Sequence, residues 1–322
     1  MKGIYCVKRQ QAAHVATSQP GASVIASDNA GTTPVEYPAL QGFASATSRT
    51  GQRKYVSLVR ADLFLLIGGA ALSLAIAVSP HKIHRFEAIA AALLLVGSAV
   101  AKALNHARHF DRDWFQGRSV SESIKNVSWR YMMRVAPYDT GDDDADSALL
   151  SVFQELLHSF DTLRPTREWV ATDPHFIPDA MRAVRSLPSD DRRAFYLRER
   201  VHGQLVWYAA KSEENDRKAT LWYWISLVVQ AAAALFALVQ IARPDAPDLV
   251  AFLTIIAVAC TAWNQLRQHE QLTKTYALVA HDLLLLRERI GIARDEETFG
   301  KLVKDTEETI SREHTLWMAK RS

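Results

Sequence analysis

Four long stretches without a formal charge constrain the fold of this chain more than any other feature of its sequence. They cover residues 63–80, 88–101, 219–242 and 249–266. A helix needs roughly 20 mostly apolar residues to cross a bilayer, so the third stretch suffices and the first and fourth come close. The second is long enough if its span runs over residues 86–104, with Glu87 and Lys102 near the two interfaces.

Short loops join these stretches in pairs, and Pro80, Pro244 and Pro247 lie in the loops as helix breakers. Backbone polar groups in lipid require such spans to be helical. We therefore expect an all-α membrane protein with two transmembrane helical hairpins, four spans in all, and long amphipathic cytosolic helices. The alternative is a soluble protein with four buried helices, which the overall 48% of hydrophobic residues permits. Four apolar runs paired by short loops favour the membrane protein.

Lysine and arginine are distributed unevenly around the two hairpins. Fifteen lie near the outer flanks of the spans, whereas the hairpin loops hold only Lys82, Arg85 and Arg243. Because positive residues stay on the cytoplasmic side, we expect a multi-pass membrane protein with both termini in the cytoplasm. Trp222 and Trp263 stand at span ends, where an aromatic belt is expected.

The two halves repeat one order of parts, namely a lead-in helix, a hairpin and an exit helix. We expect residues 1–35 to be disordered, because they lack apolar periodicity. Residues 36–136 form the first hairpin unit and residues 188–322 the second. Residues 137–187 between them are predicted to be a cytosolic helical linker.

Both exit segments carry apolar residues at heptad spacing. In the first half these are Val120, Ile124, Val127 and Tyr131, and in the second half Leu272, Tyr276, Val279, Leu283, Leu286 and Ile290. This spacing predicts packing against other helices. Two alternatives stay open: packing on the lead-in helix of the same chain, and a coiled coil between chains that builds a homo-oligomer.

Small residues recur at helical spacing in the first two spans. They are Gly68, Gly69, Ser73 and Ala77, followed by Gly97 and Ala101. Small residues at this spacing let helix backbones approach closely in a membrane. The predicted contact lies either inside the hairpin or between subunits.

The sequence carries no motif of an enzyme: it has no glycine-rich phosphate loop, GxSxG, HExxH or CxxC. We therefore expect no catalytic, cofactor-binding or metal-binding residues. The acidic run 139–146 departs from the EF-hand pattern, and the histidine pairs 81/84 and 106/109 lack further ligands nearby. A net charge of only +3 gives no basis for a nucleic-acid partner. The lipid bilayer is the predicted partner.

The middles of the spans hold no Asp, Glu, Lys or Arg. Ion-coupled carriers usually need such groups inside the membrane, whereas a pore can be lined by weakly polar side chains. The candidates for such a lining are Ser73, Ser98, Ser226, Gln230, Gln240, Thr254, Thr261 and Asn264.

Four motifs resemble those of a known family. The run YLRERVHGQLVWYAAKSEEN, residues 196–215, stands directly before the second hairpin. The first half contains EYPAL at 36–40, QRKYVSLVRADLFLL at 52–66 and WFQGRSVSESIKNVSWRYMMR at 114–134. Over roughly residues 36–322 the chain resembles two tandem members of the SMODS- and SLOG-associating two-transmembrane effector family, abbreviated SLATT.

This resemblance implies a membrane effector of a prokaryotic conflict or defence system. Such effectors are thought to be triggered by a sensor or nucleotide-signalling protein encoded nearby, and to oligomerise into pores that permeabilise the inner membrane. The matching motif positions are Arg118, Glu122, Trp129 and Arg130 in the first half, and Tyr196, Arg200, Gln204, Trp207 and Tyr208 in the second. We expect them to dock helices on one another, with ligand sensing as the alternative. A membrane-anchored scaffold and a constitutive channel are the competing functions.

Overall fold

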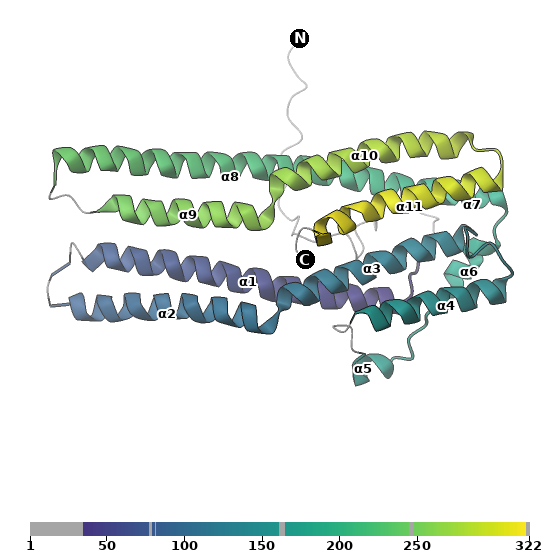
Figure 1. Cartoon of the computed structure of the whole chain (residues 1–322), viewed down its shortest axis with the longest axis horizontal. Helices are drawn as coiled ribbons and strands as arrows, with labels where there is room; N and C mark the ends of the chain where they lie inside the picture. The colour runs from purple at the N-terminus through teal and green to yellow at the C-terminus, as the bar shows by residue number, and fades with distance from the viewer. Residues whose placement is uncertain (1–34, 77–78, 81, 161–164, 245–247, 320–322) are drawn as a thin grey trace, which may run out of the picture. The chain divides into compact units, whose positions relative to one another are not determined.

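The computed structural model of this chain describes residues 35–76, 79–80, 82–160, 165–244 and 248–319, the last eight of them by backbone alone. All regular structure within these ranges is helical, and Figure 1 labels the helices in chain order. The segment 1–34, predicted to be disordered, lies outside the described residues.

The first half is built from three long helices. α1 (Ala39–Ile76) and α2 (His84–Arg108) form a hairpin, and α3 (Phe110–Met132) returns along the first part of α1. His109 joins α2 to α3 with a left-handed backbone, at φ 48°. This single residue redirects the chain, so that α3 leaves the hairpin and packs on the lead-in part of α1.

Three further helices follow α3. They are α4 (Asp142–Ser159), α5 (Arg167–Val170) and α6 (Asp179–Ser186). α3 contacts both α4 and α6. α4 begins within the acidic run that departs from the EF-hand pattern. Three aspartates lie in its first turn, where the positive end of the helix dipole stabilises their negative charges.

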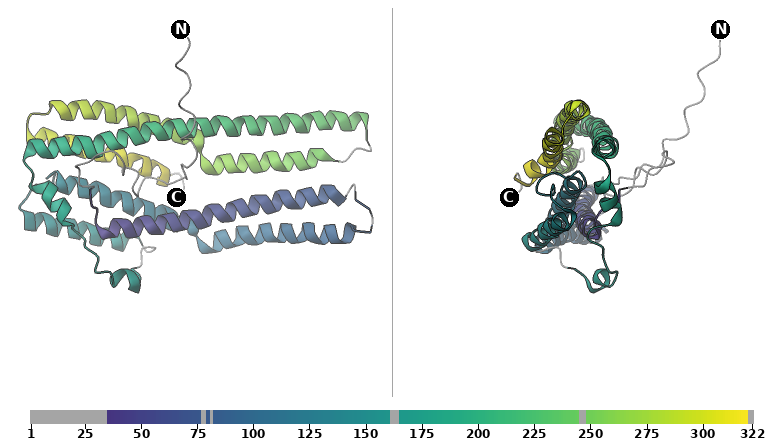
Figure 2. Two further views of the ribbon diagram at one scale, coloured as in Figure 1. Left: turned by 180° about the vertical axis from the view of Figure 1, so that it is seen from behind. Right: turned by 90° about the vertical axis from the view of Figure 1, so that its right-hand side faces the viewer.

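The second half begins with one unbroken helix of 54 residues, Ser189–Ala242. It consists of α7 (Ser189–Phe195), the π-helical segment η1 (Tyr196–His202) and α8 (Gly203–Ala242). α9 (Leu249–Arg267) completes the hairpin. Gln268, at φ 49°, then turns the chain into α10 (His269–Ile292), and α11 (Glu296–Ala319) follows. Figure 2 shows α8 beside α9 and α1 beside α2 from behind.

Four helical segments are long and apolar enough to cross a membrane, which confirms the predicted architecture. They are Ala39–Ile76, His84–Arg108, Ser189–Ala242 and Leu249–Ile292. In each of them the most apolar window of 18 residues is at most 17% buried within the chain. The spans thus face their surroundings, whereas the buried core lies in the helices beyond them.

The apolar seams of the exit helices are covered within this chain. Leu283 and Ile290 on α10 are completely buried, as are Val120 and Ile124 on α3. The α10 seam packs with α8 and α11 in a cluster that consists of Leu205, Tyr208, Tyr276, Val279, Ala280, Leu283 and Ile310. Packing on helices of the same chain therefore occupies the faces that a coiled coil between chains would use.

Candidate functional site

The exit helix of the first half meets its lead-in helix through glycines. A Cβ atom on Gly117 of α3 would lie 2.8 Å from the backbone N of Ser48, and one on Gly51 of α1 would lie 2.6 Å from the backbone N of Trp114. Close approach is also marked by the hydroxyl of Ser48, which donates to the carbonyl of Trp114 at 2.9 Å. No larger residue fits at either glycine without moving a helix.

The second half carries a buried ion pair between η1 and α11. Nε of Arg200 donates to Oε1 of Glu307 at 2.9 Å, and Nη2 donates to Oε2 at 2.7 Å. Glu307 is completely buried and Arg200 is 3% exposed. Burial opposes the charge on Arg200, but the Glu307 carboxylate outweighs it and raises the pKa of the guanidinium.

Three aromatic residues enclose this pair. The hydroxyl of Tyr196 donates to Oε1 of Glu307 at 3.0 Å, and the guanidinium of Arg200 lies 5.9 Å from the ring centre of Trp129. The indole of Trp129 donates to the hydroxyl of Tyr37 at 2.8 Å. Burial raises the pKa of Tyr196 well above its ordinary value, and Glu307 adds to this effect. We refer to Tyr37, Trp129, Tyr196, Arg200 and Glu307 as the helix junction.

The helix junction joins the two halves of the chain. Trp129 lies on α3 in the first half, Arg200 on η1 in the second, and Glu307 on α11. Asn126 on α3 adds a direct tie, because its side-chain amide donates to the carbonyl of Glu307 and to the hydroxyl of Ser311, both at 2.9 Å. Movement of α11 must therefore disturb both halves together.

The structure brings some of the predicted docking residues together and separates others. Trp129, Tyr196 and Arg200 meet in the helix junction. Trp207 and Tyr208 pack instead on Tyr276 of α10, with ring centres 5.5 and 5.6 Å away.

The remaining four predicted docking residues lie outside these two groups. Gln204 is half-buried on α8 and Arg118 is half-buried on α3. Glu122 accepts from Nζ of Lys125 at 2.9 Å, and Arg130 donates to the carbonyl of Ala136. A docking role for these residues, and the pairing of Arg118 with Glu122, stay predictions.

Sequence reasoning missed several residues that the structure places at these contacts. Glu307 and Asn126 were not singled out, since nothing local in the sequence marks their partners. Arg185 was also missed: it is 1% exposed and donates to the carbonyls of Tyr131, Tyr138 and Thr140 at 2.7 to 2.9 Å. Its guanidinium thus holds the loop between α3 and α4 against the end of α3.

The small residues of the first hairpin line the contact between α1 and α2. Cβ atoms on Gly68 and Gly97 would each lie 3.3 Å from a leucine of the opposite helix, and one on Gly69 would lie 3.1 Å from Leu95. Ala101 is buried, and the hydroxyl of Ser73 donates to the carbonyl of Gly69 at 3.0 Å. Ala77 lies outside the described residues.

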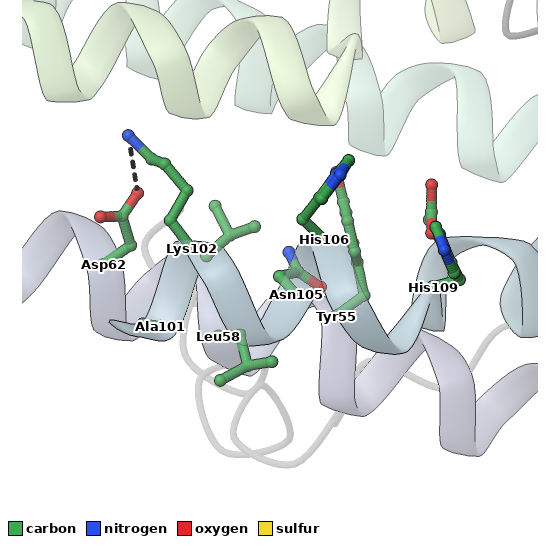
Figure 3. Close-up of a pocket in the computed structure, with 10 residues that line it drawn as sticks. Tyr55, Leu58, Asp62, Ala101, Lys102, Asn105, His106 and His109 are labelled. Carbon is green, nitrogen blue, oxygen red and sulfur yellow. Dashed lines mark ion pairs between the residues drawn. The ribbon is translucent and has the colours of Figure 1, made fainter. Parts of the chain in front are cut away.

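A hollow of about 300 Å³ opens between α1 and α2 near the start of α3 (Figure 3). Asp62 forms an ion pair with Lys102 at 3.8 Å and accepts from the hydroxyl of Ser98 at 2.6 Å. His106 and His109 line the same hollow, with ring centres 5.9 Å apart. Among the described residues, no group of three or more His, Cys, Asp or Glu side chains is placed to hold a metal ion.

The second hairpin has a hollow of about 460 Å³ between α8 and α9. Gln230 lines it from α8, and Thr254, Thr261 and Gln265 line it from α9. Three of the weakly polar span residues predicted to line a pore, Gln230, Thr254 and Thr261, thus share one hollow. The remaining lining consists of Ala233, Ala257, Val258 and Ala262.

Two hairpins with four spans, joined to packed helices beyond the membrane, define a multi-pass all-α membrane protein. The family model described as "SMODS and SLOG-associating 2TM effector domain 3" matches residues 38–193, and that of domain 1 matches residues 196–317. The chain therefore belongs to the SLATT family and carries two of its effector domains in tandem, as the sequence motifs predicted. The first match includes residues 137–187, between the two hairpin units.

The comparisons with curated proteins and with solved structures found no match.

Proposed function

We propose that this protein is an effector of a prokaryotic conflict or defence system, which oligomerises in the bacterial inner membrane and permeabilises it when a partner activates it. The partner we propose is a sensor or nucleotide-signalling protein encoded nearby. Tandem SLATT effector domains support the conflict role. The excess of positive residues outside the hairpin loops supports a cytoplasmic location for the helix junction and for both termini.

The observation that carries the permeabilising function is the polar hollow of the second hairpin. Gln230, Thr254 and Thr261 give this hollow hydrogen-bonding groups within spans that are otherwise apolar. Weakly polar groups of this kind can line a water-filled path. The spans are at most 17% buried within the chain, so ample surface is available for contacts between copies. In an oligomer, hollows from several hairpins would face one common path.

Ion flux through the purified full chain in liposomes tests this proposal directly. A triple variant, Gln230→Leu with Thr254→Val and Thr261→Val, keeps the size of the side chains and removes the polar lining. We expect it to insert normally and to conduct much less. Ser73→Ala is the control. Its hydroxyl donates to a carbonyl of its own helix, as those of Thr254 and Thr261 do, but it lies in the first hairpin and does not line the hollow. Undiminished flux through the triple variant would contradict a lining role for the hollow.

Expression in a bacterium tests the conflict role. We expect induction together with the neighbouring genes to collapse the membrane potential and to stop growth. An unchanged potential under these conditions would remove the basis for the effector function. Steady conductance in planar bilayers without any trigger would instead favour a constitutive channel.

A membrane-anchored scaffold is the second candidate, and one surface favours it. Leu278, Leu285 and Ile292 follow one another at intervals of seven on α10 and are 58%, 62% and 77% exposed. This stripe lies opposite the buried seam and could take a helix of a partner. The scaffold would be favoured by two results together. The chain would bind a stable partner that Leu285→Glu no longer binds, and it would show no ion flux in liposomes.

A further inference from the structure

Two arginines from different hairpins meet at one tryptophan. Arg60 of α1 places its guanidinium carbon 5.2 Å from the ring centre of Trp263, and Arg267, at the end of α9, lies 5.8 Å from the same ring. Trp222 of α8 packs on this ring, with the centres 6.3 Å apart. α1 and α9 are in contact, so the group lies where the two hairpins adjoin.

Neither arginine has an acidic partner among the described residues. Glu214 attracts Arg267 electrostatically, but it already bonds to Lys211 and Lys218. Arg267 is half-buried, and it is the first residue beyond the uncharged stretch 249–266. Burial lowers the pKa of Arg267, and the neighbouring charge of Arg60 adds to this effect. Two like charges thus lie within 6 Å of one ring centre, one of them partly out of water, without a counter-ion from the described chain.

We propose that Arg60 and Arg267 bind the phosphate of an anionic lipid headgroup, with Trp222 and Trp263 packing on the glycerol and upper acyl region. A phosphate diester offers oxygens to both guanidinium groups and neutralises their mutual repulsion. Tryptophan prefers this depth of the bilayer. The lipid would occupy the boundary between the hairpins and hold their ends together. This site is separate from the polar hollow and from the helix junction.

Lipid binding to the purified full chain in neutral detergent tests the proposal. The probes are phosphatidylglycerol, phosphatidylcholine and inorganic phosphate, and native mass spectrometry measures the bound lipid. We expect phosphatidylglycerol to bind in preference to phosphatidylcholine. The double variant Arg60→Gln with Arg267→Gln should weaken phosphatidylglycerol binding by about thirtyfold. Each of the two arginines contributes a similar share of the attraction to the anionic headgroup, and the variant removes both shares.

Arg49→Gln with Arg53→Gln is the matched control, since both arginines are exposed on α1 and carry the same total charge. They precede Arg60 by at least seven residues, or about 10 Å along the helix, which is a full screening length. We expect a loss below about threefold in this control. The single variant Arg60→Gln, at an exposed position, tests the site without removing a partly buried group.

Three outcomes would overturn the site. They are equal losses in the two double variants, no preference for phosphatidylglycerol in the unmodified chain, and full binding by Arg60→Gln. Binding of inorganic phosphate to the same arginines, without retention of phosphatidylglycerol, would assign them to a free anion and would contradict a lipid site.

Discussion

The two halves of this chain share an order of helices but hold those helices together in different ways. In the first half, Gly51 and Gly117 bring α1 and α3 into backbone contact. In the second half, large aromatic side chains separate the helices, and α11 adds a buried ion pair between Arg200 and Glu307. The first contact depends on the absence of side chains, whereas the second depends on exact partners for a buried charge.

This difference predicts different sensitivities. A glycine contact tolerates changes in charge nearby but no added volume. A buried ion pair tolerates changes in volume around it better than the loss of one charge, because the remaining charge is then left without a partner. Four substitutions or changes of condition probe the difference, from the largest expected effect to the smallest.

Glu307→Gln should have the largest effect. It leaves the buried guanidinium of Arg200 without its counter-charge, and breaking a buried pair in this way costs about 3–5 kcal/mol. Hydrogen exchange of the full chain in detergent should show α11 and η1 opening far more often. Glu308→Gln is the control: Glu308 is exposed and lies 3.9 Å from Lys304. Equal protection in both variants would show that the pair does not hold α11.

Gly117→Ala should come next, with a loss of about 2–3 kcal/mol, because its Cβ would meet backbone atoms at 2.8 and 2.9 Å. Thermal unfolding followed by circular dichroism measures this loss. Gly300→Ala is the control for glycine itself, since the nearest atom to its Cβ lies 4.0 Å away. That variant should gain about 0.5–1 kcal/mol from helix propensity. A gain in both variants would contradict close contact in the first half.

Lowering the pH should destabilise the second half alone. His269 is buried and donates from Nδ1 to Oδ1 of Asn215 at 2.7 Å. Burial lowers its pKa to about 4, helped by Arg267 and Lys218. The unfolded chain therefore takes up a proton first, and stability falls as the pH drops below about 6.5.

Between pH 7 and pH 5 this loss should amount to about 1–2 kcal/mol. Hydrogen exchange of α10 at both pH values measures it. His269→Gln should remove this dependence on pH, whereas His202→Gln, at an exposed position, should keep it. The same dependence in His269→Gln would assign the effect to another group.

Gly68→Ala should have the smallest effect, within about 0.5 kcal/mol. Its Cβ would lie 3.3 Å from Cδ1 of Leu94, and the end of a leucine can move where a backbone cannot. Thermal unfolding of Gly68→Ala and of Gly117→Ala compares the loss of stability at a side-chain contact with the loss at a backbone contact. A loss as large as that of Gly117→Ala would show that the hairpin is packed as tightly as the α1–α3 contact.

The spans and the family could be predicted from sequence because their signals are local. A run of uncharged residues such as 219–242 needs no partner to be recognised, and the motif around Arg200 is contiguous. The helix junction could be predicted only in part. Trp129, Tyr196 and Arg200 were singled out, but Glu307 lies 107 residues from Arg200 and sits in a helix with many carboxylates. Only packing selects which carboxylate is buried.

The left-handed residues between helices were also beyond sequence reasoning. His109 and Gln268 occupy the same place in the two halves, although neither is a glycine or an asparagine. Histidine is enriched among the few non-glycine residues with positive φ, but glutamine is not. Local preference therefore does not predict this backbone in both halves, whereas the packing of α3 and α10 on their lead-in helices favours it.

The unbroken helix from Ser189 to Ala242 has a mechanical consequence. At about 1.5 Å per residue it measures about 80 Å, whereas the apolar core of a bilayer is about 30 Å thick. No proline interrupts it. Because the helix is continuous, a twist applied at Arg200, where α11 is held, would reach Gln230 in the second hairpin, about 45 Å along the same helix.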